Sequence, residues 1–205
     1  MDKKVGKEDR KMLDTHCRKY INPIIERTAK LFIYLGFSAN KITILAFLVG
    51  MFTSVMIYCN TSIVACTLLW ISGFLDSVDG AVARITKSSS SIGTLMDIVS
   101  DRVVEIGIIL AIGIINYNVR LELIILTSTI VISMTVFLTV GALSVHKGVK
   151  SFYYQAGMME RTEGFIMFTL MILFPKYLSC IILIFALFII ITVFQRINEA
   201  RKILN

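Results

Sequence analysis

Charged residues are scarce in this chain of 205 residues. Lys, Arg, Asp and Glu make up 17% of it, whereas a soluble domain carries about a quarter. Hydrophobic residues make up 56%, and the mean hydropathy is +0.79. This composition all but excludes a water-soluble globular protein and a disordered chain. Proline occurs only at Pro23 and Pro175, among long apolar runs that favour membrane helices over the alternating segments of a barrel.

Cysteine is also infrequent. The four cysteines, at positions 17, 59, 66 and 180, form no C-x-x-C pair and have no histidine nearby at metal-binding spacing. This argues against a disulfide scaffold and a thiolate metal site, and we interpret the cysteines as isolated small apolar residues. A disulfide between Cys59 and Cys66 is the alternative. The charged stretch 1–11 has no apolar core, so we do not expect a cleaved signal peptide.

Long apolar stretches recur along the rest of the chain. A helix needs about 20 apolar residues to cross a bilayer. We therefore predict an all-α fold, an integral membrane bundle of six transmembrane helices in a single domain over residues 1–205. The predicted spans are residues 42–59, 62–83, 93–116, 121–144, 161–175 and 177–198.

Basic residues are distributed unevenly between these spans. Six crossings place both termini on one side, together with nineteen of the twenty-one Lys and Arg residues, and only Arg120 and Lys176 lie on the other side. Because Lys and Arg accumulate in the cytoplasm, we predict a multi-pass protein of the cell (inner) membrane with cytoplasmic termini. The net charge of +7 then indicates contact with anionic membrane lipids, and we expect no nucleic acid partner.

The segment before the first predicted span, residues 10–35, is amphipathic. Its apolar residues recur at helical spacing, and lysines and arginines occupy the other positions. We predict an interfacial helix that lies on the inner leaflet. Asn22 and Pro23 are typical of an N-cap and a first helical residue, so we expect a new helix to begin there.

Four acidic residues interrupt the second and third predicted spans, where acids are costly and mark functional sites. Asp76 and Asp79 are three residues apart, and Asp97 and Asp101 are four apart, so each pair shares one helix face. Because the turn between the two helices is short, we expect the helices to be adjacent and antiparallel. The four carboxylates then converge near the cytoplasmic surface, where we place the active site.

Four carboxylates in a low-dielectric site require neutralisation. Oxygen ligands without His or Cys suit Mg²⁺, Mn²⁺ or Ca²⁺. Gly80 and Gly93 leave room for a ligand, and Arg84 offers a fork to a phosphate. Two divalent cations beside this arginine would form a site for phosphoryl displacement. In a purely structural alternative, the acids pair with Arg84, Lys87 and Arg102.

The spacing of these residues matches a known signature. Residues 76–101 fit the pattern D-x2-D-G-x2-A-R-x8-G-x3-D-x3-D at every fixed position, and the chain thereby resembles the CDP-alcohol phosphotransferase family. The six-span layout and the amphipathic N-terminal helix are similar to that family too. The resemblance implies transfer of a phosphatidyl group from a CDP-linked lipid, of the CDP-diacylglycerol type, to a small alcohol with release of CMP. It also implies two Mg²⁺ or Mn²⁺ ions and a homodimer.

The resemblance further implies roles for individual residues. The positions that correspond to metal ligands are Asp76, Asp79, Asp97 and Asp101. Asp101 also corresponds to the general base that takes the proton of the acceptor hydroxyl. The positions that correspond to the CDP-lipid pocket are Asn40, Thr43, Gly80, Arg84, Ser90 and Gly93. The stretch around Asn40 departs from the family, because Ala39 stands where proline is common.

The acceptor pocket is less well defined. Lys147, Arg161 and Arg201 are expected on the cytoplasmic side, where they would bind a phosphate of the acceptor, unless they only follow the charge bias of that side. The run Gly157 to Glu163 resembles G-x-x-E-R-x-E-R of the branch that uses inositol phosphate, although Gly164 replaces the second arginine. We expect inositol phosphate as the acceptor, with glycerol-3-phosphate or serine as alternatives. A cation-coupled membrane transporter is the alternative from another functional class.

Overall fold

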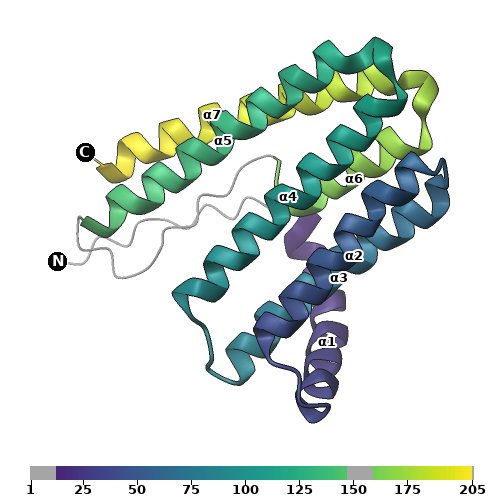
Figure 1. Ribbon diagram of the computed structural model, residues 1–205. Helices are drawn as coiled ribbons and strands as arrows, with labels where there is room; N and C mark the ends of the chain where they lie inside the picture. The colour runs from purple at the N-terminus through teal and green to yellow at the C-terminus, as the bar shows by residue number, and fades with distance from the viewer. Residues whose placement is uncertain (1–12, 147–158, 205) are drawn as a thin grey trace.

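The computed structural model describes residues 13–146 and 159–204, and these form α-helices joined by short turns, without β-strands. Two 3₁₀ turns, η1 and η2, precede the fifth and seventh helices (Figure 1). The elements are α1 (Leu13–Tyr34), α2 (Ala39–Tyr58), α3 (Ser62–Ile85), α4 (Ser91–Ile115), η1 (Tyr117–Val119), α5 (Arg120–His146), α6 (Arg161–Leu173), η2 (Pro175–Tyr177) and α7 (Leu178–Leu204). The predicted all-α fold is confirmed.

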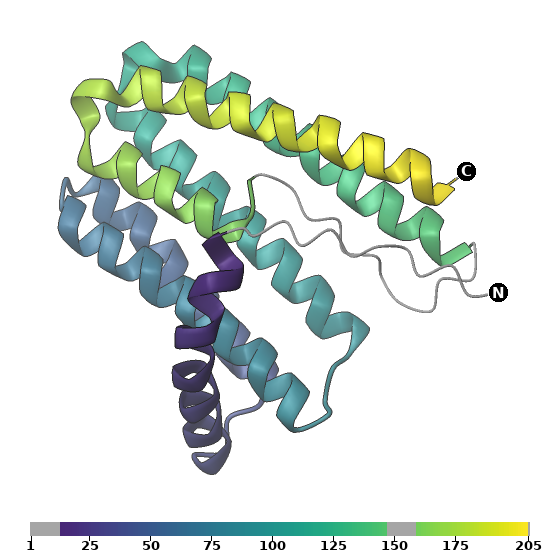
Figure 2. The same cartoon turned by 180° about the vertical axis from the view of Figure 1, so that it is seen from behind.

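The helices form two groups that α4 and α6 connect. In the first group α2 packs along α3, α4 packs against α2, and α1 packs against α3 (Figures 1 and 2). In the second group α5 and α7 run side by side. α6 contacts both α3 and α7, and α4 contacts α5, so these two helices join the groups. The first residue of α6 forms an ion pair with Asp76, which places the start of α6 beside the acidic part of α3.

Two clusters of buried apolar side chains stabilise this arrangement. The larger cluster contains residues of every helix from α2 through α7 and includes Leu69, Ile108 and Phe168, which are at most 1% exposed. The smaller cluster joins α1, α2 and α3 through residues that include Ile42 and Val78. Because lipid tails are as apolar as these side chains, close van der Waals packing supplies the stabilisation within a membrane.

Glycines bring α2 and α4 close together. At Gly50 of α2, a β-carbon would lie 2.6 Å from Val104 of α4 and 2.8 Å from the hydroxyl of Ser72 on α3. At Gly107 of α4, a β-carbon would lie 2.7 Å from the hydroxyl of Ser54 on α2. We expected α3 and α4 to be adjacent and antiparallel. In the structure α4 packs mainly along α2, and it approaches α3 through acidic side chains of the two helices.

Helices lie at all six predicted span positions, but only some are typical membrane spans. As a membrane span, α4 is disfavoured by the charges of Asp97, Asp101, Arg102 and Glu105. α6 has 13 residues, which is shorter than the about 20 that a span needs. Six crossings therefore stay a prediction. Four segments of the described chain are long and apolar enough to cross a membrane: Ala39–Tyr58, Ser62–Ile85, Tyr117–Leu143 and Pro175–Arg201.

α1 is one helix, so the expectation that a new helix begins at Asn22 and Pro23 was wrong. Pro23 lies inside α1 and is exposed. Proline cannot donate the backbone hydrogen bond to the fourth residue before it, and here the helix continues past Pro23. After α1, Gly36 takes a φ of 77° and the N–H of Phe37 donates to the carbonyl of Phe32 over 3.0 Å, which turns the chain into α2.

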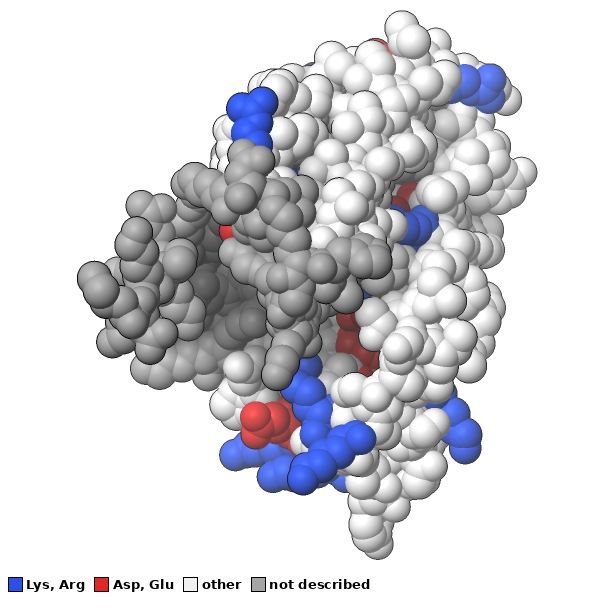
Figure 3. Space-filling model, turned by 90° about the vertical axis from the view of Figure 1, so that its left-hand side faces the viewer, with Lys and Arg blue, Asp and Glu red and all other residues white. Residues whose placement is uncertain are grey.

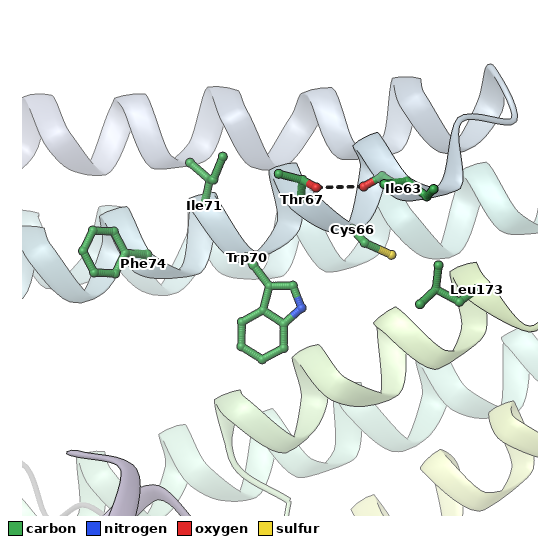
Figure 4. Close-up of a pocket in the computed structure, with 7 residues that line it drawn as sticks. All are labelled: Ile63, Cys66, Thr67, Trp70, Ile71, Phe74 and Leu173. Carbon is green, nitrogen blue, oxygen red and sulfur yellow. Dashed lines mark hydrogen bonds between the residues drawn. The ribbon is translucent and has the colours of Figure 1, made fainter. Parts of the chain in front are cut away.

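An apolar groove of about 600 Å³ lies between α3 and the end of α6 (Figure 4). It is lined by Ile63, Cys66, Thr67, Trp70, Ile71, Phe74 and Leu173.

Cys59 and Cys66 are both free thiols, so the alternative of a disulfide between them is wrong.

Candidate active site

The acidic residues surround a small cavity between α2, α3, α4 and α6. Its volume is about 20 Å³, which is room for about one water molecule. The polar residues that line it are Thr43, Ser72, Asp76, Ser100, Asp101, Glu105 and Arg161. Acids from α3 and from α4 therefore face the same space.

Three of the four predicted acids come together. Asp76 of α3 and Asp97 and Asp101 of α4 each offer one carboxylate oxygen, and these atoms lie within 4.8 Å of one another. Asp76 is 9% exposed. Oδ1 of Asp97 is buried and has no hydrogen-bond partner among the described residues. Because a buried oxygen without a partner is costly and oxygen ligands suit Mg²⁺ and Mn²⁺, these residues fit a divalent cation.

Asp79 has a different environment. It is 7% exposed, and the hydroxyl of Thr43 donates a hydrogen bond of 2.5 Å to its Oδ2. The group of three ligand oxygens does not include it. Its role as a metal ligand stays a prediction, and Thr43, which we expected to contact the nucleotide, binds this carboxylate in the structure.

Arg161, the first residue of α6, contacts two of the three clustered acids. Its Nη1 donates to Oδ2 of Asp76, and its Nη2 donates to Oδ1 of Asp101 over 2.6 Å. Arg102 instead pairs with Glu105 over 2.5 Å on its own helix. Within the part of the chain that the structure describes, the alternative pairing of the acids with Arg84, Lys87 and Arg102 is not observed.

Residues assigned to the CDP-lipid pocket meet at the start of α4. Ser90 is the N-cap of this helix, and its Oγ accepts a hydrogen bond of 3.1 Å from the N–H of Gly93. A β-carbon at Gly93 would lie 3.2 Å from Oδ1 of Asn40. On α3, a β-carbon at Gly80 would lie 3.3 Å from Nη1 of Arg84, whose side chain is exposed. The two glycines thus keep a helix N-terminus and a guanidinium open to an anionic ligand.

Of the three basic residues predicted for the acceptor, the structure brings Arg161 to the acids. Arg201 is exposed near the end of α7 and forms no ion pair with a described carboxylate. Lys147 lies outside the described residues.

Sequence reasoning missed three polar residues that line the cavity. Glu105 follows Asp101 by four residues, and Ser72 precedes Asp76 by four, so helical spacing could have identified both. Ser100 also lines the cavity and follows Asp97 by three residues, so the same spacing could have identified it.

The charge around the site is uneven. Figure 3 shows acidic side chains recessed in a hollow of the surface and several basic side chains at one end of the molecule, with others elsewhere on this face. Lys41 at the start of α2 and Arg84 and Lys87 at the end of α3 are exposed. Basic side chains near a recessed acidic site favour the approach of an anionic substrate that carries its own counter-ions.

Comparison with known proteins gives a consistent result. A family model of CDP-alcohol phosphatidyltransferases matches residues 37–194. The archaetidylinositol phosphate synthase of Pyrococcus horikoshii is 32% identical over 105 residues, and the match covers 50% of this chain but only 56% of that enzyme. The inner membrane protein YnjF of Escherichia coli is 26% identical over 196 residues, which cover 91% of this chain and 94% of YnjF.

The fold is shared with solved structures of a Mycobacterium tuberculosis phosphatidylinositol phosphate synthase. The structure with CDP-DAG bound has a TM-score of 0.69 and 20% identity, and covers 87% of this chain and 94% of that one. The structure with manganese and citrate has a TM-score of 0.68 at 20% identity, with coverage of 86% and 88%. The family match extends over most of the chain and leaves the transporter alternative without support. The chain therefore belongs to the CDP-alcohol phosphatidyltransferase family and is an integral membrane enzyme of that class.

Proposed function

We propose that this enzyme acts in phospholipid biosynthesis by transferring the phosphatidyl group of a CDP-diacylglycerol type lipid to a small alcohol. The observation that carries the proposal is the group formed by Asp76, Asp97 and Asp101. Their ligand oxygens lie within 4.8 Å of one another, and one buried oxygen of Asp97 lacks a partner among the described residues. This is the donor set that a phosphoryl-transfer site requires for divalent cations.

The acids would have different roles in the reaction. When bound, two Mg²⁺ or Mn²⁺ ions would polarise the pyrophosphate and neutralise the charge that develops on it. Asp76, Asp97 and Asp101 would hold these ions, and Asp79, oriented by Thr43, would complete the set. Asp101 takes the proton of the acceptor hydroxyl. The hydroxyl oxygen forms a bond to the lipid-side phosphorus, the bond between this phosphorus and the CMP oxygen breaks, and CMP leaves with the electron pair.

The donor's CDP group would bind at the start of α4 and the end of α3. Asn40, Ser90 and Gly93 surround the N-terminus of α4, where a backbone dipole favours phosphate. Gly80 and the exposed guanidinium of Arg84 would provide the opposite wall.

The proposed acceptor is inositol phosphate, with glycerol-3-phosphate or serine as alternatives. Two relatives support it by name, the archaetidylinositol phosphate synthase and the phosphatidylinositol phosphate synthase. The position of Arg161 beside Asp101 also supports it, because an acceptor phosphate needs a cationic partner near the base. Lys147 and Arg201 would complete that pocket.

We further propose a single domain with six membrane crossings, cytoplasmic termini and active site, and a homodimeric assembly in the cell's inner membrane. Four apolar helices support the crossings. In the described part of α1, Ile24, Leu31 and Tyr34 are more than half exposed, as expected for a helix that rests on a lipid surface.

The test is a transfer assay with the purified enzyme in lipid nanodiscs. Labelled CDP-diacylglycerol, Mn²⁺ or Mg²⁺ and each candidate alcohol are supplied in turn, and CMP release is measured. We expect cation-dependent release with one alcohol, and its loss in Asp101→Asn. Glu122→Gln is the matched control, because Glu122 accepts a 2.8 Å hydrogen bond from Ser179, outside the site. A folded enzyme that releases no CMP with any of the alcohols would contradict the proposal.

A further inference from the structure

The guanidinium of Arg161 bridges carboxylates from two different helices. Nη1 contacts Asp76 on α3, and Nη2 contacts Asp101 on α4, while Arg161 itself begins α6. The contacted carboxylates are two of the three that lie close enough to share a cation. One arginine therefore connects the three helices through carboxylates that a divalent cation would use.

The positive charge of Arg161 makes this contact energetically important. Three carboxylates in a cavity within a membrane protein are costly without positive charge. In the described part of the chain, Arg161 is the residue that forms ion pairs with this group, since Arg102 pairs with Glu105. A guanidinium suits this task better than an ammonium, because its planar fork donates from two nitrogens to two carboxylates at once.

The packing of α6 on α3 aims Arg161 at the acids. Phe165, one turn after Arg161, fills the space that Gly73 of α3 leaves open. The ring of Phe165 lies 5.7 Å from Cζ of Arg161 and stacks edge-on against Trp70, with 6.1 Å between ring centroids. Nε1 of Trp70, which extends from α3 (Figure 4), donates to the hydroxyl of Thr169 over 3.1 Å. Movement of the guanidinium therefore does not require α6 to leave α3.

We propose that Arg161 is an exchangeable counter-ion of the cation site. Without divalent cations, its guanidinium neutralises Asp76 and Asp101 and holds them in facing positions. When cations bind, the guanidinium leaves these oxygens while α6 remains docked through Phe165. The inference rests on the proposed function, because it requires the three acids to bind cations. It adds a competition between an internal arginine and the metal, which a passive acceptor-binding role does not include.

Competition predicts opposite changes in two measurable quantities. Arg161→Gln should lower the melting temperature of the cation-free protein, because the acids lose their partner. The same change should tighten Mn²⁺ binding by about tenfold, because the cation no longer displaces an ion pair. Arg161→Lys, which keeps the charge but not the fork of two nitrogens, should fall between the wild type and Arg161→Gln in both quantities. A purely structural role would weaken both stability and Mn²⁺ binding.

The experiment measures Mn²⁺ binding by electron paramagnetic resonance and melting in EDTA, on the purified full-length protein in detergent. Arg120→Gln is the charge-matched control, because Arg120 donates to the carbonyl of Gly113 at the junction of α4 and α5. If the wild type binds Mn²⁺ and Arg161→Gln binds it with the same or a lower affinity, the inference is wrong, whereas the proposed cation site stands. Failure of the wild type to bind Mn²⁺ would overturn the proposed cation site as well.

A second measurement needs no variant. Phenylglyoxal modifies accessible arginines, and mass spectrometry reads the extent at each position. In the wild type, Mn²⁺ should increase modification of Arg161 and leave that of Arg120 unchanged. If Mn²⁺ decreases modification of Arg161 or leaves it unchanged, the guanidinium is not released and the inference is wrong.

Discussion

The hydroxyl of Thr43 donates a 2.5 Å hydrogen bond to Oδ2 of Asp79, and so links the second turn of α2 to the acidic part of α3. Both residues are buried, with 6% of Thr43 and 7% of Asp79 exposed. The same hydroxyl lies 3.2 Å from the carbonyl of Ala39. One hydroxyl proton cannot serve both acceptors at once, and the shorter distance favours the carboxylate. Thr43 is therefore positioned to fix the orientation of Asp79.

Thr43→Val should show this effect, because it removes the hydroxyl with little change in shape. A buried carboxylate then loses a donor, and we expect a loss of about 1–3 kcal/mol in the free energy of unfolding together with a lower kcat. Thr43→Ser keeps the hydroxyl and serves as the control. The measurements are unfolding of the purified protein and CMP release. A valine variant with wild-type stability and kcat would show that Asp79 is oriented without Thr43.

Asp97→Asn and Asp101→Asn should separate cation binding from proton transfer. Each removes one charge from the group of three ligand oxygens, so both should weaken Mn²⁺ binding. Asp101→Asn also removes the proposed base, so its turnover should fall by more than the 10²–10⁴-fold typical of a general base. Mn²⁺ binding is measured by titration, and CMP release is measured at saturating Mn²⁺. Equal turnover of the two variants under that condition would contradict the role of Asp101 as base.

The sequence was sufficient to predict the helices and the pair Asp97 and Asp101 on one face of α4, because both depend on local patterns. Apolar runs locate the helices, and the spacing of Asp97 and Asp101 places both on one helix face. The partner of α4 was not predictable in this way. It depends on Gly50 and Gly107, whose small size permits close approach but does not identify the approaching helix.

The contact between Arg161 and Asp76 shows the same limit. The two residues are 85 positions apart, and the contact depends on how α6 docks on α3. That docking uses Phe165 and Gly73, which in the sequence are indistinguishable from other phenylalanines and glycines of membrane helices. Helix positions follow from local hydrophobicity, whereas the charge pairs within the site follow from tertiary packing.

Gly73→Ala should therefore disturb the site through α6. The added methyl group would overlap the ring of Phe165, and we expect a loss of about 1–3 kcal/mol in stability from overpacking, with reduced turnover. Gly164→Ala on α6 is the matched control. There the nearest atom, of Phe185, would be 3.9 Å from the new carbon, so this change should be neutral or slightly stabilising.

Shortening Phe165 should relieve the effect of Gly73→Ala. The double variant Gly73→Ala with Phe165→Leu should recover part of the stability that the single change loses, because the smaller side chain leaves space for the methyl group. A thermal unfolding cycle over the four proteins measures this coupling. Additive losses would show that the two residues do not act on each other.

The membrane orientation is testable with a native thiol. Cys59 is free and exposed at the turn between α2 and α3, and six crossings place this turn outside the cytoplasm. Ser89, in the exposed turn between α3 and α4, would lie in the cytoplasm. A membrane-impermeant maleimide should therefore label Cys59 in intact cells. In a variant with Ser89→Cys as the only cysteine, labelling should require permeabilised cells. Labelling of that variant in intact cells would show the opposite orientation, with the acidic site outside the cytoplasm.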